Sequence, residues 1–388
     1  MNRFRALDIA RGVAILGTLG TNIWIFTRTM EMTWLSALSS ALTNGKFLGL
    51  LTLMFGIGMQ LKHDSLQRRG LPWRRIYIWS MILLFLDGFL HYVFVFEFDV
   101  LMSYAFVGII ASLLITRSKK VILSVIILSL AVHGFSQFGP TPWSIGGEEP
   151  PLTAEEKRTL NERFGGTLFD DRGEIDWSEA EYEWDIAETY VGQVQDRLAH
   201  FWEGRQEAIM IIPMNLALFL IGALLVQAGL IGTDRRARTL QRRVLLFGLL
   251  VGVPLLLLSE YLPDRFPSLG MAGRYIIAPM VAFFYLGLVF LWERTRFLPI
   301  LQSGLEHVGK MALTCYIGQN VISSILFYEW GFGLAPLESD AQTVLAWACI
   351  GFTLMLLSTI WLRYFERGPI ESLWKKAEAL AYPKRPTA

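Results

Sequence analysis

The chain has 388 residues, of which 53% are hydrophobic, and it carries 13 Trp and 26 Phe. Its mean hydropathy of +0.42 is higher than soluble domains usually reach, so we expect a membrane protein that crosses the bilayer several times. No nucleic-acid module and no zinc-type Cys/His spacing occurs, so we predict neither a nucleic-acid partner nor a metal site. Both cysteines, Cys315 and Cys349, lie in apolar segments, which predicts free thiols and no disulfide framework.

The first apolar segment begins with charges. Asp8 and Arg11 precede the mostly apolar run 12–27, and residues three apart on a helix share a face and can pair. Asn22 returns to nearly the same face about 16 Å further along the helix axis. Polar groups at membrane depth usually face a protein interior or a water-filled cavity. No cleavage site follows this segment, so we expect it to be retained as a membrane helix.

Windows of apolar residues predict ten membrane helices. They cover residues 8–27, 46–62, 74–96, 99–115, 121–138, 208–230, 243–262, 271–292, 311–330 and 341–362. If the N-terminus is cytoplasmic, the cytoplasmic connections hold most of the 35 Lys and Arg, and they are residues 62–75, 116–120, 231–243, 293–310 and the tail from 363. This distribution obeys the positive-inside rule at every connection. We therefore predict an all-α polytopic membrane protein with both termini in the cytoplasm.

One connection differs from the others. Residues 139–207 contain half of the 34 acidic residues and few basic ones. Within them, the run from Trp177 to Trp202 is rich in aromatic residues, which disordered tracts lack. We therefore predict a small helical extracytoplasmic insertion, with a disordered acidic linker as the alternative. The predicted divisions are a five-helix bundle (1–138), the insertion (139–207), a second five-helix bundle (208–362) and a cytoplasmic tail (363–388).

Several short motifs follow one another along the whole chain. They are Leu7-Asp8-x-x-Arg11-Gly12 with Asn22-Ile23, Gly45-Lys46-Phe47, Leu53-Met54-Phe55-Gly56-Ile57-Gly58, Gly88-Phe89-Leu90-His91, Asp99-Val100-Leu101-x-x-Tyr104-Ala105, Gly309-Lys310-Met311-Ala312-Leu313-Thr314-x-Tyr316-x-x-Gln319 and Gly368-Pro369-Ile370-Glu371. In this order they resemble the YeiB-like family of bacterial membrane proteins, the domain of unknown function 418. The resemblance implies a multi-pass protein of the bacterial plasma (inner) membrane.

That family is similar to transmembrane acyltransferases, among them the acyltransferase 3 enzymes and the lysosomal heparan-glucosaminide acetyltransferase. The resemblance implies that cytosolic acyl-CoA, acetyl-CoA included, is a co-substrate that is not permanently bound. It also implies contact with membrane lipids and an acceptor that is an extracytoplasmic glycan or a lipid-linked molecule. A homodimer is compatible with the resemblance. In the acyltransferase 3 branch a catalytic His stands eleven residues after the motif's Arg. Here that position is Asn22, and an amide cannot act as a general base.

His91 is the predicted substitute for that base. Asp87 lies four residues earlier on the same helical face, and Asp99 follows across a short connection. Flanking carboxylates orient an imidazole and raise its basicity, so His91 can deprotonate an acceptor hydroxyl or amine. Asp87 is not part of the family's pattern. The alternative is a structural histidine that anchors a turn near the lipid headgroups.

Arg11 is the predicted contact for the phosphates of acyl-CoA, since its guanidinium suits phosphate geometry. Asp8 is expected to hold it in place. The alternative is that Arg11 only anchors the helix on its cytoplasmic side.

Further candidate substrate contacts lie in the second half of the chain. Tyr316 and Gln319 share one face of the ninth segment and either line a polar channel or bond between helices. Glu260 and Arg274 lie at the outer ends of the seventh and eighth segments. They either pair with each other or hold a charged substrate.

Three functions remain open at this point. The first is a transmembrane O- or N-acyltransferase, in which His91 is the base, Asp99 orients it, Asn22 donates to the developing oxyanion and Arg11 binds the donor. The second is a transporter or lipid-handling carrier with proton coupling through the His/Asp site. The third is a non-catalytic receptor that uses the acidic insertion.

Overall fold

The computed structural model describes residues 4–29, 33–138, 158, 189–261, 273–295 and 297–383. Within these residues every regular element is a helix. The α-helices are α1 (Arg5–Thr27), α2 (Trp34–Thr43), α3 (Lys46–Arg68), α4 (Trp73–Phe94), α5 (Leu101–Leu114), α6 (Lys119–Phe138), α9 (Tyr190–Ala199), α10 (Gln206–Met210), α11 (Ile212–Gln227), α12 (Arg235–Phe247), α13 (Val253–Tyr261), α15 (Ala278–Glu293), α16 (Pro299–Lys310), α17 (Ala312–Phe327), α18 (Asp340–Tyr364) and α19 (Pro369–Ala379). A 3₁₀ turn (Glu203–Arg205) precedes α10, and π turns (Gly248–Gly252 and Gly273–Ile277) precede α13 and α15.

The prediction of an all-α polytopic membrane protein is confirmed. Among the described residues, eight helical spans are long and apolar enough to cross a membrane, and α5 and α17 are apolar but shorter. Each of the ten predicted segments coincides with one of these helices. Pro254 falls inside the seventh segment. It has no N–H to donate, and the helix widens into a π turn over Gly248–Gly252 just before it.

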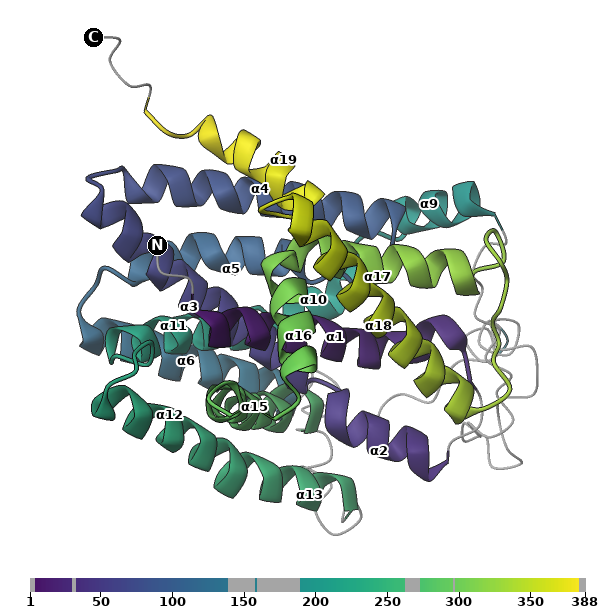
Figure 1. The fold of residues 1–388 in the computed structure, drawn as a ribbon, viewed down its shortest axis with the longest axis horizontal. Coiled ribbons are helices and arrows are strands. Elements are labelled where there is room, and N and C mark those ends of the chain that lie inside the picture. The colour runs from purple at the N-terminus through teal and green to yellow at the C-terminus, as the bar shows by residue number, and fades with distance from the viewer. Residues whose placement is uncertain are drawn as a thin grey trace.

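The helices of the bundle run mostly along one direction (Figure 1). The connections α3–α4, α5–α6 and α11–α12 lie together at the left end of that view, where α1 also begins. These are the basic connections that the sequence predicted to be cytoplasmic. We call this end of the molecule the inner end and the opposite end the outer end. These names follow the orientation that the positive-inside rule predicts.

Three helices lie where the sequence predicted connections or tail. Residues 293–310 were predicted as a cytoplasmic connection, and within them Pro299–Lys310 forms α16. Helix α2 lies in the first outer connection and α19 in the tail. All three are short and amphipathic, so a hydropathy window averages their two faces and misses them. Proline at the first turn of α16 and α19 provides a local start signal.

Helix α16 crosses α1 in direct contact (Figure 1). Two glycines make this approach possible. A Cβ added at Gly12 would lie 2.0 Å from the carbonyl oxygen of Leu305, and one at Gly309 would lie 1.8 Å from that of Asp8. Backbones this close exclude any side chain between the helices, so small residues are required there.

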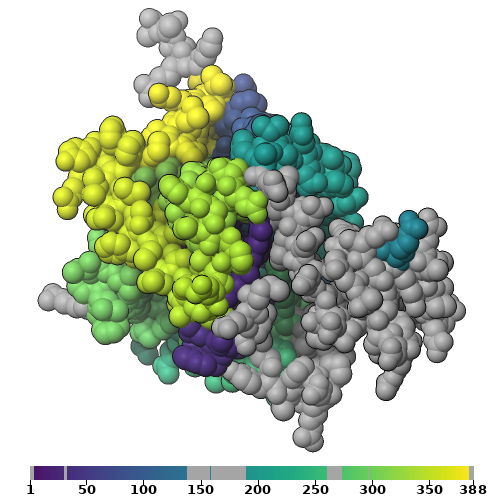
Figure 2. Space-filling model, turned by 90° about the vertical axis from the view of Figure 1, so that its right-hand side faces the viewer, coloured from purple at the N-terminus to yellow at the C-terminus, as the bar shows by residue number. Residues whose placement is uncertain are grey.

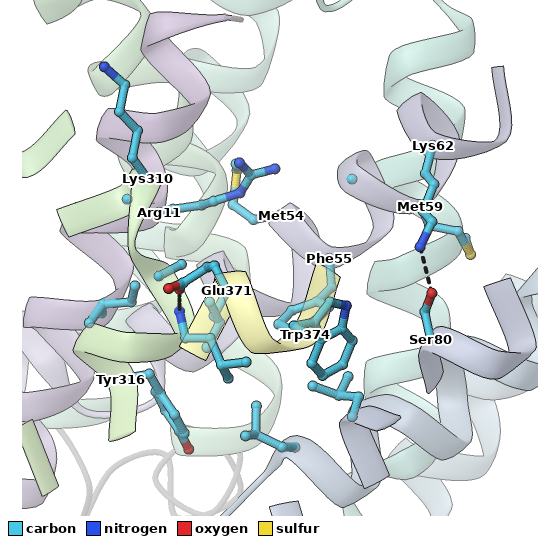
Figure 3. A pocket seen from close by; sticks show the side chains of 18 of the residues that line it. Arg11, Met54, Phe55, Met59, Lys62, Ser80, Lys310, Tyr316, Glu371 and Trp374 are labelled. Atoms are coloured by element: carbon cyan, nitrogen blue, oxygen red, sulfur yellow. Dashed lines mark hydrogen bonds between the residues drawn. The ribbon is translucent and has the colours of Figure 1, made fainter. Parts of the chain in front are cut away.

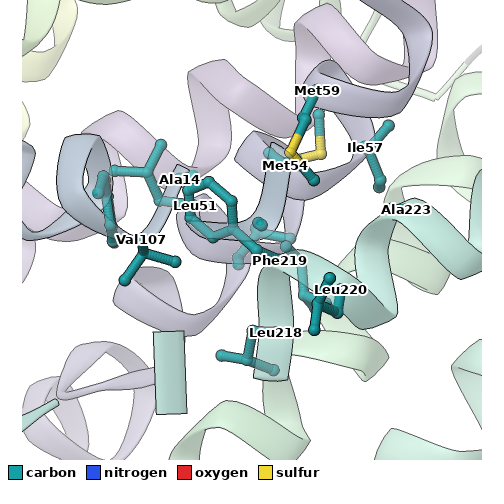
Figure 4. Packing of buried hydrophobic residues seen from close by; sticks show 14 of the residues in the cluster. Ala14, Leu51, Met54, Ile57, Met59, Val107, Leu218, Phe219, Leu220 and Ala223 are labelled. Carbon is teal, nitrogen blue, oxygen red and sulfur yellow. The ribbon is translucent and has the colours of Figure 1, made fainter. Parts of the chain in front are cut away.

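The main hydrophobic core draws on helices from both predicted bundles (Figure 4). Phe219 of α11 packs among Leu51 of α3, Ala14 of α1 and Val107 of α5. Gly56 lets α3 approach α11, because a Cβ there would lie 2.1 Å from the carbonyl oxygen of Phe219. The first and second halves of the chain therefore share one core within the described residues.

The described part of the acidic insertion is attached to the outer end of α4. The side chain of Arg197 on α9 forms an ion pair with Glu97 at 2.9 Å, and the Tyr190 hydroxyl donates to the carbonyl of Phe94. Trp330, after α17, donates to Gln193 at 3.1 Å, and Figure 2 shows that α9 lies beside the segment that follows α17. The prediction of a helical insertion otherwise falls on residues 139–157 and 159–188, which lie outside the described residues.

Candidate functional site

A cavity of about 430 Å³ opens in the inner half of the protein. Its lining combines apolar side chains with cations and one carboxylate. Its lining includes Arg11, Ile15, Leu51, Met54, Lys62, Tyr77, Ser80, Met81, Leu84, Leu101, Lys310, Tyr316, Arg367, Glu371, Trp374 and Lys375. In Figure 3 the side chains of Lys310 and Arg11 lie towards one end of this inner cavity, and Tyr316 lies at the other. The cavity therefore has a basic end and an apolar end.

The cations of the inner cavity are held by acids behind them. Arg11 Nη1 lies 3.1 Å from Asp8 Oδ1, so the predicted i,i+3 pair is present. Lys310 pairs with Glu306, which also accepts from Arg5 at 2.8 Å. Burial raises the pKa of Glu306, but Lys310 and Arg5 outweigh it and hold that pKa below its usual value. These acids orient Arg11 and Lys310 at the edge of the cavity.

Helix α19 forms one wall of the inner cavity. Glu371 accepts from the backbone N–H groups of Leu313 and Thr314, at 2.7 and 3.0 Å, and so caps the first turn of α17. Further along α19, the buried Glu378 pairs with Lys62 of α3 and with Lys375. These contacts fix α19 against the bundle.

The electrostatics of Glu378 follow from this placement. Burial alone would raise the pKa of its carboxyl, but Lys62 and Lys375 lower that pKa to about 2. Ser80 of α4 also donates to Glu378 at 2.9 Å. The carboxylate is therefore charged, hydrogen-bonded and shielded from water.

A second cavity, of about 290 Å³, opens in the outer half. Polar side chains line much of it, together with a few apolar ones. Its lining includes Thr18, Thr21, Asn22, Ile25, Leu48, Phe98, Asp99, Val100, Arg205, Glu207, Ile211, Arg274 and Tyr316. Asn22 thus faces the same outer cavity that Asp99 borders. Among the described residues, Tyr316 alone lines both cavities.

A buried His–Asp pair lies beside Tyr316, which both cavity linings share. His91 Nδ1 is 3.1 Å from Asp99 Oδ1, and both side chains are 0% exposed. His91 Nε2 is 3.1 Å from the amide nitrogen of Asn320. Since the carboxylate accepts the Nδ1 proton, Nε2 accepts from Asn320. Both ring nitrogens are engaged, and His91 lines neither cavity.

Asp99 is held by four donors. Besides His91, the Tyr316 hydroxyl approaches Oδ1 at 3.5 Å, and the backbone N–H groups of Leu101 and Met102 donate to Oδ2 at 2.9 and 3.4 Å. The carboxylate thereby caps the start of α5. Arg205 donates to the backbone carbonyl of Asp99 at 2.7 Å, which fixes this turn from the side of the insertion.

The remaining predicted site residues are not brought together. Asp87 is half-buried on α4 and lines neither cavity, and its Oδ2 has no hydrogen-bond partner among the described residues. Gln319 is fully buried and donates to Thr18 at 3.4 Å, so it too lies outside both linings. Arg274 lines the outer cavity and pairs with Glu207 at 3.0 Å. The side chain of Glu260, its predicted alternative partner, lies outside the described residues.

Sequence reasoning missed several residues of the two cavities. Lys310 and Glu371 occur in motifs that the sequence comparison used only to support family resemblance. Arg205 lay in a segment considered for its acidity. For Lys310 the signal was a cation next to an apolar segment, which the positive-inside rule explains without any site. Only the packing of α16 and α19 distinguishes cavity residues from anchors.

These features define a class of protein: an all-helical, multi-pass membrane protein with two cavities and a buried His–Asp pair beside the tyrosine that both share. Residues 225–381 match the family described as Protein of unknown function (DUF418). The resemblance to the YeiB-like DUF418 family that the motifs predicted is confirmed over these residues.

The relatives are similar over almost their full length. The chain is 26% identical to the uncharacterized protein YxaH of Bacillus subtilis (strain 168), over 98% of this chain and 95% of that protein. It is also 26% identical to the uncharacterized protein YeiB of Escherichia coli (strain K12), over 97% and 96% of the two chains. An uncharacterized 39.9 kDa protein of Bacillus acidopullulyticus is 22% identical over 96% and 93%.

Proposed function

We propose that the protein is a membrane acyltransferase that moves an acyl group from cytosolic acyl-CoA to an extracytoplasmic or lipid-linked acceptor. The observation that carries the proposal is the pair of cavities on opposite sides of Tyr316. A donor that enters from one side and an acceptor that enters from the other would meet at a single point. We also propose the bacterial plasma membrane as its location.

The inner cavity suits the donor. Its basic end, with Arg11 and Lys310, complements phosphate groups. Its apolar end, with Leu51 and Leu101, suits the thioester arm and its acyl group. An amphipathic molecule with an anionic head and an apolar tail would therefore lie with its thioester near Tyr316.

The outer cavity suits a hydroxyl or amine acceptor. Asp99 and Glu207 are the described carboxylates that line this cavity. Glu207 is paired with Arg274, so we assign Asp99 the role of general base, with His91 as the residue that positions it. This reverses the two roles that the sequence suggested, because both nitrogens of His91 are engaged. Asn22 faces the same cavity and is the proposed donor to the oxyanion.

The reaction balances as follows. The acceptor O–H or N–H gives its proton to Asp99 while its oxygen or nitrogen bonds to the thioester carbon. The carbon–sulfur bond then breaks, and CoA leaves as a thiolate into the inner cavity, where water protonates it. Asp99 releases its proton to the outer cavity. The products are an ester or amide and free CoA.

Binding of the donor is the first test. We expect the purified protein in nanodiscs to bind acetyl-CoA, and Arg11→Gln or Lys310→Gln to weaken that binding roughly tenfold, a loss of about 1.4 kcal/mol. Arg243→Gln is the matched control, because Arg243 is exposed on α12 and lines neither cavity. Calorimetry that detects no acetyl-CoA binding, or equal losses in the control, would remove the donor assignment.

Vectorial transfer is the second test. Proteoliposomes that receive radiolabelled acetyl-CoA on one side and a lipid-linked or free glycan on the other should form acylated product. The transporter alternative predicts a different outcome, namely solute flux between the two sides without covalent product. Asp87 gives this alternative its support, since a buried carboxylate oxygen without a partner is typical of proton-coupled sites.

A further inference from the structure

The boundary between the two cavities is thin. On three helices, residues that line the inner cavity and residues that line the outer one are close neighbours in sequence. They are Ile15 and Thr18 on α1, Leu51 and Leu48 on α3, and Leu101 and Val100 at the start of α5. On α17 a single side chain, Tyr316, belongs to both linings. Its ring therefore separates the two spaces directly.

The surroundings of Tyr316 differ in how easily they can move. The wall formed by α3, α5 and α11 is fixed by buried hydrogen bonds, in which Thr52 joins Tyr104 at 2.9 Å and Asn215 at 3.2 Å. Asn215 in turn donates to Ser103 at 3.2 Å. The Tyr316 hydroxyl lies 3.5 Å from Asp99 and also bonds to the backbone of Val100, and the ring contacts His91. A rotation of the Tyr316 side chain would break fewer hydrogen bonds than a shift of any neighbouring helix.

The same ring covers Asp99. The carboxylate borders the outer cavity but is 0% exposed, and the Tyr316 hydroxyl lies over its Oδ1. As long as the ring stays in place, neither cavity has free access to the His–Asp pair.

We propose that Tyr316 is a movable partition: displacing its ring joins the inner and outer cavities into one passage and uncovers Asp99. The inference goes beyond acyl transfer, because it concerns the route between the cavities, whichever molecule uses it. For an acyltransferase, the passage would admit the thioester to the acceptor. For a transporter, it would be the gate.

Cysteine accessibility tests the partition without any substrate. In a protein whose two native cysteines are replaced by alanine, Leu51→Cys places a thiol in the inner cavity, and Thr21→Cys places one in the outer cavity. A membrane-impermeant cationic thiol reagent is applied from the outer side of oriented membranes. With Tyr316 present, we expect labelling at Thr21→Cys only. With Tyr316→Ala or Tyr316→Ser, we expect Leu51→Cys to be labelled at a rate that approaches that of Thr21→Cys.

Matched variants separate the partition from general loosening. Tyr316→Phe keeps the ring and should keep Leu51→Cys unlabelled from outside. Tyr77→Ala removes a buried tyrosine that lines only the inner cavity, and it should also leave Leu51→Cys unlabelled from outside. Labelling of Leu51→Cys from the inner side confirms in every variant that the cavity has formed.

Two outcomes would overturn the proposal. One is a Leu51→Cys thiol that remains closed to the outside in both folded truncations of Tyr316. The other is equal outside labelling of that thiol with and without the ring, or in Tyr77→Ala. Since no acyl-CoA is needed, a negative result here leaves the acyltransferase proposal standing, and a protein without acyl transfer leaves the partition standing.

Discussion

Asn320 holds a neighbouring histidine in place. Its amide lies 3.1 Å from Nε2 of His91, and Nδ1 of the same ring lies 3.1 Å from Asp99. Interhelical bonding by amides is common in membranes. Here the bond links α17 to α4 at the candidate site.

Replacing Asn320 by leucine should destabilise the protein. The change leaves Nε2 of His91 buried without a donor, at a cost of about 1–3 kcal/mol. The apparent melting temperature in detergent measures this effect. Ile325→Leu is the control, since Ile325 is exposed on the same helix. Equal melting temperatures for both variants would mean that Asn320 does not hold His91.

Asp99→Asn should abolish most of the acyl transfer. Loss of a general base typically lowers the rate about 10²–10⁴-fold, while the neutral amide can still cap α5. The measurement is the turnover rate with saturating acetyl-CoA. Asp196→Asn on the exposed part of α9 should leave that rate unchanged. Undiminished turnover in Asp99→Asn would refute the assignment of the base.

The residue scale also marks the limit of sequence reasoning. The Asp8–Arg11 pair could be predicted because a helix fixes the distance between residues three apart. The proximity of His91 to Asn320 could not, since it depends on how α4 and α17 pack. The contact of Tyr316 with both cavities could not be predicted either, because no local sequence pattern encodes a cavity.

At the scale of the elements, the close contact between α1 and α16 restricts side-chain size most strongly. Gly309→Ala would set a Cβ 1.8 Å from the Asp8 carbonyl oxygen, so the two helices must separate. Overpacking of this kind costs about 1–3 kcal/mol or more. We expect a lower melting temperature and weaker acetyl-CoA binding, because Arg11 and Lys310 flank the contact.

Gly318→Ala is the control for that substitution. Its Cβ would meet only Leu354, at an ordinary 3.7 Å, and alanine favours a helix over glycine. The control should be as stable as the native protein or more so. If Gly309→Ala behaves like Gly318→Ala, the α1–α16 contact is less tight than described.

Helix α19 should dock in a pH-dependent way. Glu378 has a pKa of about 2 in the folded protein, below its ordinary value, so its contribution to stability is complete above the ordinary pKa. This contribution is lost as the pH falls towards 2. By linkage it amounts to about 3 kcal/mol. Melting temperatures between pH 6 and pH 3 should therefore fall less in Glu378→Gln than in the native protein.

Glu366→Gln is the corresponding control, since Glu366 is exposed just before α19. This variant should follow the pH profile of the native protein. If Glu378→Gln follows it as well, other carboxylates control the acid sensitivity.

At the scale of the whole molecule, the membrane segments could be predicted and their packing could not. Twenty or so apolar residues identify a spanning helix from composition alone. The amphipathic helices α2, α16 and α19 carry no such signal, although α16 and α19 build much of the inner cavity. Charge asymmetry predicts the orientation, and fusions of a cytoplasmic reporter to either terminus should both be active. Activity of a periplasmic reporter at one terminus would contradict this.

The wall that α19 contributes has a consequence for biosynthesis. All ten predicted membrane segments leave the ribosome before residues 367–375, which complete the inner cavity. A chain that stops after α18 would insert with its full set of spans and yet lack Trp374, Glu371 and the anchor at Glu378. Premature termination near the C-terminus would therefore produce a protein that reaches the membrane with an open inner cavity and an uncapped α17.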